Sequence, residues 1–247
     1  SRSSTGIKSE IKVFGEIYRI LKEINPDLAH FVTIKPVLYG GIASRFLGSF
    51  RKVFAISGLG FVFVAQTLKA KIVRTIVKSM YKIALGGKNS HVIVQNPDDK
   101  AVVNSIVKVP ITLIRGSGVD LSQYEYIEEN NQKIKVSMAC RLLKDKGVFE
   151  YIEASKILKK KYLNVKFELY GDIDIHNPAS LTNDDIKKIK EEGFVNVYGF
   201  SSDIAKVFSD SNIVVLPSYR EGLPKVLIEA AACGRAVVTT DVPGCRD

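Results

Sequence analysis

Two glutamates, Glu221 and Glu229, stand eight positions apart near the end of the chain. Gly222 frees the backbone between them, and Pro224 suits the first position of a helix, where a missing N–H costs nothing. Glu229 would then lie about a turn and a half inside that helix. Backbone amides at a helix N-terminus bind phosphate, and the two carboxylates could accept hydroxyl protons from a sugar and a ribose. The arrangement is typical of a nucleotide-sugar pocket. The amides expected to face the phosphate belong to Gly222, Leu223, Lys225 and Val226.

Two basic residues, Arg141 and Lys146, follow a strand expected over residues 133–138. Ligands of open α/β sheets bind beyond the carboxyl ends of the strands, so these side chains would lie where a diphosphate sits. A bidentate arginine and a point-charge lysine are suitable partners for a leaving diphosphate. A solvated basic loop is the alternative interpretation.

The elements that must position these residues alternate between strands and helices. This alternation predicts βαβ units and parallel sheets, hence an α/β protein. In the second half we expect strands at 133–138, 165–170, 195–198, 212–217 and 236–240, and helices at 148–161, 183–192, 202–208 and after 223. In the first half we expect strands at 28–33, 52–56, 91–95 and 111–114, and helices at 36–46, 66–85 and 98–107. A polar stretch near 118–132 separates the halves, which predicts a lobe at 1–118, a linker at 119–132 and a second lobe at 133–247.

Together, the Glu221-x7-Glu229 signature between two apolar strands and the Arg141-x4-Lys146-Gly147 loop resemble the retaining glycosyltransferases of the GT-B fold, family four. The resemblance covers about residues 25–247. It implies two Rossmann-like lobes of GT-B type. Family members have further strands before the first lobe and a further segment after the second. We therefore expect the first lobe to be truncated at its N-terminus and the second at its C-terminus.

The resemblance also implies roles for the site residues. Arg141 and Lys146 would stabilise the departing diphosphate of a UDP-sugar, Glu221 would hold the sugar hydroxyls, and Glu229 the ribose. Transfer would proceed with retention of the anomeric configuration. The segment Tyr198-Gly199-Phe200 would line the nucleobase with its backbone, and strand-end packing is an equally open interpretation of these three residues.

Other polar residues receive weaker assignments. Ser57 occupies the place where many family members have a histidine beneath the reacting sugar, which leaves the role of that position open. His30 is expected to be a core histidine rather than a catalytic one. Asp172 and Asp174 form an Asp-x-Asp pair that could hold a metal, but such pairs arise by chance. The resemblance requires no metal, so we expect neither a metal nor another cofactor.

The charge of the chain is concentrated in one block. The net charge is +10, and residues 28–97 contain ten Lys and Arg but no Asp or Glu. Lys71, Arg74, Lys78 and Lys82 would form one face of the helix at 66–85. We expect either a solvated face over a core or a surface for anionic lipid. Nucleic acid is not an expected partner, because no recognition helix is apparent and aromatics are not interleaved with the charges. The apolar residues expected on another face of this helix are Ile72, Val73, Ile76, Val77, Met80 and Tyr81.

The pattern of residues 57–61, together with residues 92–99, is similar to family members that build bacterial surface polysaccharides such as capsule or lipopolysaccharide. The expected acceptor is thus a lipid-linked sugar. The chain shows three unpaired cysteines, no signal peptide and no apolar run long enough to cross a bilayer. We expect a cytoplasmic protein, peripheral on the inner face of the plasma membrane. Two alternatives are a dinucleotide-dependent Rossmann enzyme, although no Gly-x-Gly-x-x-Gly is present, and a non-enzymatic basic module on membranes or RNA.

Overall fold

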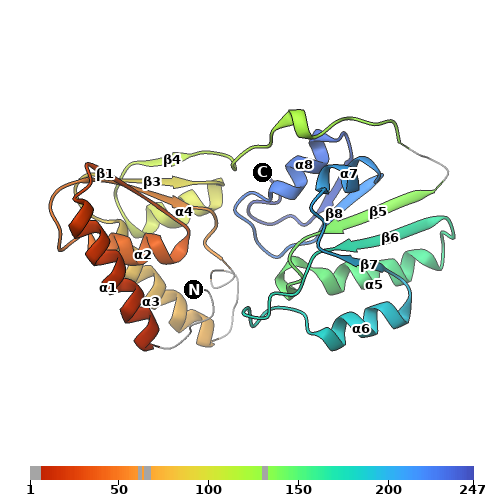
Figure 1. Ribbon diagram of the computed structural model, residues 1–247, viewed down its shortest axis with the longest axis horizontal. Coiled ribbons are helices and arrows are strands. Elements are labelled where there is room, and N and C mark those ends of the chain that lie inside the picture. Colours follow the sequence, from red (N-terminus) through yellow and green to blue (C-terminus); the bar gives the residue numbers. More distant parts are fainter. Residues whose placement is uncertain (1–6, 61–62, 64–67, 130–132) are drawn as a thin grey trace. The chain divides into compact units, whose positions relative to one another are not determined.

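A computed structural model describes residues 7–60, 63, 68–129 and 133–247. Its contacts divide the chain into two compact units, Ser1–Gly116 and Ser117–Arg246. Each unit contains one parallel sheet covered by helices, as Figure 1 shows. This confirms the expected α/β class with two Rossmann-like lobes. Among the described helices, none combines the length and the apolar character that a membrane crossing requires.

The sheet of the first unit has four parallel strands in the order β1-β2-β3-β4. Its strands are β1 (Leu28–Val32), β2 (Arg51–Ile56), β3 (Ser90–Val94) and β4 (Ile111–Leu113). Its helices are α1 (Ile7–Ile24), α2 (Ile34–Ala43), α3 (Leu68–Leu85) and α4 (Pro97–Ile106). The core centres on Phe31 and Phe54, whose stacked rings lie 5.4 Å apart. Helix α4 begins as its sequence dictates, since the side chain of Asn96 accepts a hydrogen bond from the Asp99 amide and Pro97 follows the cap.

Two sequence expectations fail in this unit, at His30 and in α3, and one helix was left unassigned. Helix α1 was not expected, although Phe14, Ile17 and Tyr18 pack against the core at helical spacing. His30 is exposed rather than in the core, because β1 is an edge strand and His30 lies on its uncovered positions. In α3, Tyr81 is buried as the periodicity predicts, but Ile72 and Ile76 are exposed at 57% and 55%.

The sheet of the second unit has five parallel strands in the order β7-β6-β5-β8-β9. Its strands are β5 (Ile134–Ala139), β6 (Val165–Tyr170), β7 (Asn196–Gly199), β8 (Ile213–Leu216) and β9 (Ala236–Thr239). Its helices are α5 (Val148–Lys159), α6 (Asn183–Glu192), α7 (Ile204–Ser209) and α8 (Lys225–Ala232), with the 3₁₀ turns η2 (Leu121–Gln123) and η3 (Lys144–Lys146). Helices α5 and α6 cover one face of the sheet, and α7 and α8 cover the other (Figure 1).

The strand order of this unit creates a switch point. From β5 the chain proceeds outward through β6 to β7, and then returns to β8 on the other side of β5. The loops after β5 and β8 therefore diverge from neighbouring strands and leave a crevice at their carboxyl ends, where open α/β sheets bind ligands. Arg141 and Lys146 follow β5, and Glu221 follows β8.

Candidate active site

The loops after β5 and β8 are joined by main-chain contacts at the switch point. The amide of Tyr219 and the hydroxyl of Ser218 both donate to the Asp145 carbonyl, at 3.0 Å and 3.2 Å. Gly147 has φ +78°, and a Cβ there would overlap the Pro217 carbonyl. Only glycine combines that dihedral with so close an approach. The glycine of the Arg-x4-Lys-Gly pattern thus lets the two loops meet.

A cavity of about 220 Å³ lies between these loops. Five of the predicted site residues line it: Arg141, Lys146, Glu221, Lys225 and Val226. Arg141 and Lys225 are 84 positions apart in the sequence, and the fold brings them to the same cavity, as the sequence patterns predict. The cavity combines cationic groups with one carboxylate, which suits a ligand that carries both phosphate and hydroxyl groups.

Lys146 and Glu221 form a close ion pair. Nζ of Lys146 donates to Oε1 of Glu221 at 2.5 Å, and the two side chains are only 16% and 13% exposed. The Glu221 amide donates to the Pro243 carbonyl at 3.0 Å, which fixes the loop that carries the carboxylate. An ammonium has three N–H donors, so Lys146 can bind Glu221 and still donate to phosphate oxygens. Sequence spacing did not predict this contact.

Arg141 is oriented by an acidic residue from the loop after β6. Nη1 of Arg141 lies 3.4 Å from Oδ2 of Asp174, and the Arg141 side chain is 56% exposed. The Ser180 hydroxyl lies 2.8 Å from the Asp174 amide and accepts its hydrogen bond, which fixes the start of that loop. In the described residues, no three His, Cys, Asp or Glu side chains group as metal ligands would. Of the Asp-x-Asp pair, Asp174 is the partner of Arg141.

Glu229 is buried within α8 and has two donors on one oxygen. Oε1 accepts a hydrogen bond from Oη of Tyr124 at 2.6 Å and forms an ion pair with Nζ of Lys225 at 3.0 Å. Tyr124 comes from the expected linker, 105 residues earlier in the chain. No sequence pattern singled out Tyr124, because a lone tyrosine in a polar stretch carries no periodic signal.

The start of α8 differs from the expectation. Pro224 is the N-cap residue, with extended dihedrals of φ −73° and ψ 112°, and the helix begins at Lys225. Proline fixes only φ, so it fits a cap as well as the first helical position. The amides of Lys225 and Val226 belong to the first turn and cannot bond a preceding helical carbonyl. Both residues line the cavity, whereas Gly222 and Leu223 are not among its lining residues.

The segment expected at the nucleobase lies at the end of β7. Tyr198 stacks on Tyr170 with ring centroids 4.9 Å apart, and the Gly199 carbonyl accepts a hydrogen bond from Gly171 at 2.7 Å. Phe200 is 74% exposed. Tyr198, Gly199 and Phe200 do not line the cavity between the two loops. Their role at a nucleobase therefore remains a proposal.

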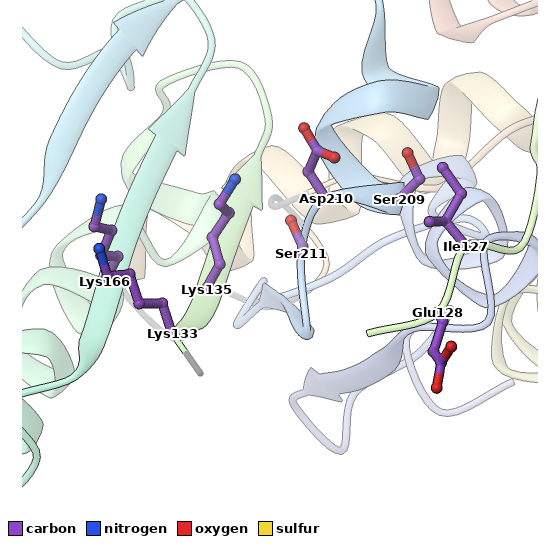
Figure 2. Close-up of a pocket in the computed structure, with 8 residues that line it drawn as sticks. All are labelled: Ile127, Glu128, Lys133, Lys135, Lys166, Ser209, Asp210 and Ser211. Atoms are coloured by element: carbon purple, nitrogen blue, oxygen red, sulfur yellow. The ribbon is translucent and has the colours of Figure 1, made fainter. Parts of the chain in front are cut away.

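A larger cavity of about 440 Å³ lies at the opposite ends of the strands. Figure 2 shows Lys133, Lys135 and Lys166 on one side of it and Ser209, Asp210 and Ser211 on the other. Lys133 directly precedes β5, while Lys135 and Lys166 lie near the amino ends of β5 and β6. Because α/β sheets bind their ligands at the carboxyl ends, the smaller cavity is the better candidate for the active site.

The cysteine beside the site is not a candidate nucleophile. Burial raises the pKa of the Cys140 thiol to about 12, so Cys140 remains protonated at neutral pH. All three cysteines are free thiols. The chemistry of the cavity therefore depends on the arginine, the lysines and Glu221.

Comparison with known families decides the assignment. The family described as "Glycosyl transferases group 1" matches residues 123–247, and the family "Glycosyl transferase 4-like" matches residues 1–96. This chain belongs to the group 1 glycosyltransferases. Membership confirms the resemblance found in the sequence.

Individual relatives agree with the family. The chain is 29% identical to N,N'-diacetylbacillosaminyl-diphospho-undecaprenol alpha-1,3-N-acetylgalactosaminyltransferase of Campylobacter jejuni, with 99% of this chain and 67% of the relative covered. It is 26% identical to the capsular polysaccharide biosynthesis glycosyltransferase CapM of Staphylococcus aureus, with 98% and 67% covered. HepE of Anabaena, solved in complex with UDP and glucose, superposes with a TM-score of 0.68 at 19% identity, with 98% and 66% covered. The chain thus spans about two thirds of the length of these proteins.

Proposed function

We propose that the protein transfers a sugar from a nucleoside diphosphate donor, UDP in the first instance, to a lipid-linked sugar acceptor. The convergence of Arg141, Lys146, Glu221 and Lys225 on one cavity at the switch point carries this proposal. Two comparisons support the substrates: the Campylobacter relative is named for a diphospho-undecaprenol acceptor, and the Anabaena protein was solved with UDP and glucose.

In this proposal the cationic groups stabilise the leaving diphosphate. Negative charge accumulates on the diphosphate as the glycosidic bond breaks, and preorganised donors in a partly closed site lower the barrier most effectively there. Lys146 is the better buried of the two loop cations and Arg141 the more exposed. The amides at the start of α8 would add the partial positive charge of a helix N-terminus.

Glu221 binds the donor sugar and Glu229 the ribose in the same proposal. Lys146 keeps Glu221 in place while its other N–H groups face the diphosphate. The sugar and the leaving group are then held by one connected pair of side chains. We further propose that transfer retains the anomeric configuration, which rests on the Glu221-x7-Glu229 signature and which NMR of the product's anomeric proton would test.

The proposed location is the inner face of the plasma membrane, with α3 as the contact surface. Lys71, Lys78 and Lys82 are exposed along this helix, and Arg74 is half-buried. Next to this basic stripe, Ile72, Ile76 and Ile83 are exposed by more than half of their area. Exposed apolar residues beside lysines are typical of helices that lie in a membrane interface. This combination supports anionic lipid as a partner.

The proposal is tested by incubating the protein with UDP-, GDP- and ADP-sugars and measuring nucleotide release with and without a lipid-linked acceptor. We expect release from a UDP-sugar, and we expect EDTA to leave it unchanged, because side chains and a helix N-terminus neutralise the diphosphate. Loss of release on chelation, restored by manganese, would make Asp172 and Asp174 metal ligands. Absence of release from every donor would refute the proposed function.

A further inference from the structure

Tyr124, from the segment that was expected to be a linker, belongs to the second unit and reaches the buried carboxylate of Glu229 in α8. Its hydroxyl donates to Oε1 of Glu229 at 2.6 Å, a short distance for a hydrogen bond to a carboxylate. The Tyr124 ring packs against the cluster that includes Phe208, Val214 and Ala230, on the face of the sheet covered by α7 and α8. The hydroxyl is therefore held at Glu229 by packing of the ring.

The backbone before Tyr124 is fixed by a carboxylate cap. Oδ1 of Asp120 accepts hydrogen bonds from the Ser122 amide at 3.1 Å and from its hydroxyl at 2.7 Å, while Oδ2 accepts from Gln123 at 3.0 Å. These bonds close the 3₁₀ turn η2, and Tyr124 is its C-cap residue. The turn gives Tyr124 a defined direction although it lies in a connecting segment.

The two donors on Glu229 differ in strength. The Lys225 side chain is 57% exposed, so solvent weakens its ion pair with Glu229. Tyr124 is partly buried. Burial is the larger cause that raises the pKa of its phenol, and the hydrogen bond to Glu229 raises this pKa further. Tyr124 therefore remains protonated and donates throughout the neutral range.

We propose that Tyr124 is a positioning residue for the nucleotide: it holds Oε1 of Glu229 so that Oε2 accepts a hydrogen bond from a ribose hydroxyl. This inference rests on the proposed function, because Glu229 must bind a ribose for Tyr124 to position it. The inference gives Tyr124 a positioning role in nucleotide binding, although Tyr124 lies outside the Glu221-x7-Glu229 signature.

The test measures binding of UDP and of 2′,3′-dideoxy-UDP, which lacks both ribose hydroxyls, by calorimetric titration. Tyr124→Phe removes the hydroxyl and keeps the ring in its packing. We expect this variant to bind UDP about tenfold more weakly than the parent, the size of effect typical for loss of a hydrogen bond to a charged group. Its affinity for dideoxy-UDP should stay within about twofold of the parent's. Glu229→Gln should also reduce the difference in affinity between UDP and dideoxy-UDP.

Tyr126→Phe is the matched control. Tyr126 lies in the same segment, and its ring packs near Arg235 at 5.6 Å. We expect Tyr126→Phe to bind both ligands like the parent. If Tyr124→Phe weakens the binding of both nucleotides equally, or of neither, the positioning role is wrong. The proposed donor site is not contradicted by either result. If the parent binds no UDP at all, the proposed function fails and this inference with it.

Discussion

Lys146 would connect the two halves of the proposed donor chemistry, because its ammonium both lines the cavity and contacts Glu221. The Lys146 side chain is 16% exposed. The Arg141 side chain is 56% exposed and is paired with Asp174. Charge interactions strengthen as solvent is excluded. The buried lysine should therefore contribute more to diphosphate binding than the arginine.

The residue-scale prediction separates these roles by substitution. We expect Lys146→Ala to weaken UDP binding by about 2–5 kcal/mol, because the contact would be buried and charge-assisted. Arg141→Ala should weaken UDP binding less, by about 1–2 kcal/mol, because Arg141 is more exposed. Glu221→Gln preserves size, so UDP affinity should be nearly intact while sugar transfer falls by orders of magnitude. Calorimetric titration of UDP, with turnover measured in parallel, checks all three.

Lys144→Ala is the control for this series, since Lys144 is exposed in the same turn η3 and does not line the cavity. It makes the same change in charge and should bind UDP like the parent. Equal losses in Lys144→Ala and Lys146→Ala would show that net charge, rather than a defined contact, attracts the nucleotide. Full transfer by Glu221→Gln would remove Glu221 from the sugar site.

At the scale of single elements, α3 carries the distinctive surface of the first unit. Its basic stripe was expected from the sequence, but its exposed isoleucines were not. The helix packs against the core through Val77, Met80, Tyr81, Ala84 and Leu85, whereas Ile72 and Ile76 remain exposed. Such residues can enter the acyl boundary of a membrane, while lysines bind anionic headgroups at about 1 kcal/mol each.

The element-scale prediction concerns liposomes that contain anionic lipid. Replacing Lys71, Arg74, Lys78 and Lys82 by Gln should release the protein from them, and salt should weaken binding of the parent, because exposed charges are screened within about 10 Å at 0.1 M. Nucleotide release from a UDP-sugar without acceptor should be unaffected. Co-sedimentation measures the binding.

A second quadruple variant supplies the control for charge. Lys160, Lys161, Lys187 and Lys188 are exposed lysines of the second unit, and their replacement by Gln lowers the net charge equally. It should sediment with liposomes like the parent. Sedimentation of the α3 variant at the parent's level would contradict the membrane proposal.

For the whole molecule, the two units have separate cores. The core of the first unit draws its buried residues from 21–107, and the cores of the second from 136–233. All proposed donor-binding residues lie in the second unit. UDP at a hundred times its dissociation constant would stabilise the unit that binds it by about 2.7 kcal/mol.

The whole-molecule prediction follows from that separation. We expect UDP to slow hydrogen exchange in peptides from residues 117–246, above all in the loops after β5 and β8, and to leave peptides from 7–60 and 68–116 unchanged. Mass spectrometry of exchanged peptides measures this directly. Protection of equal size in both sets would place part of the nucleotide site in the first unit.

The sequence alone determined the fold class, most elements to within two or three residues, and five of the nine residues that line the cavity. It also predicted Gly222, Leu223 and Glu229 at the site, and these three do not line the cavity. Strand and helix periods are local properties, and glycine or proline at a loop restricts the backbone wherever it lies. This is why a loop followed by a helix could be expected after Glu221, although the helix begins at Lys225 and not at Pro224. The predicted cavity residues followed the same logic, since they lie in the loops after two predicted strands or at the start of a predicted helix.

Tertiary structure decided which groups touch and which apolar faces are buried. Lys146 meets Glu221 across 75 residues and Tyr124 meets Glu229 across 105, and no local pattern encodes such pairs. Burial in α3 was equally undetermined, because a helix with apolar residues on most sides fits a core in several rotations. Only the neighbouring elements select one rotation, and here that choice leaves the isoleucines beside the basic stripe in solvent.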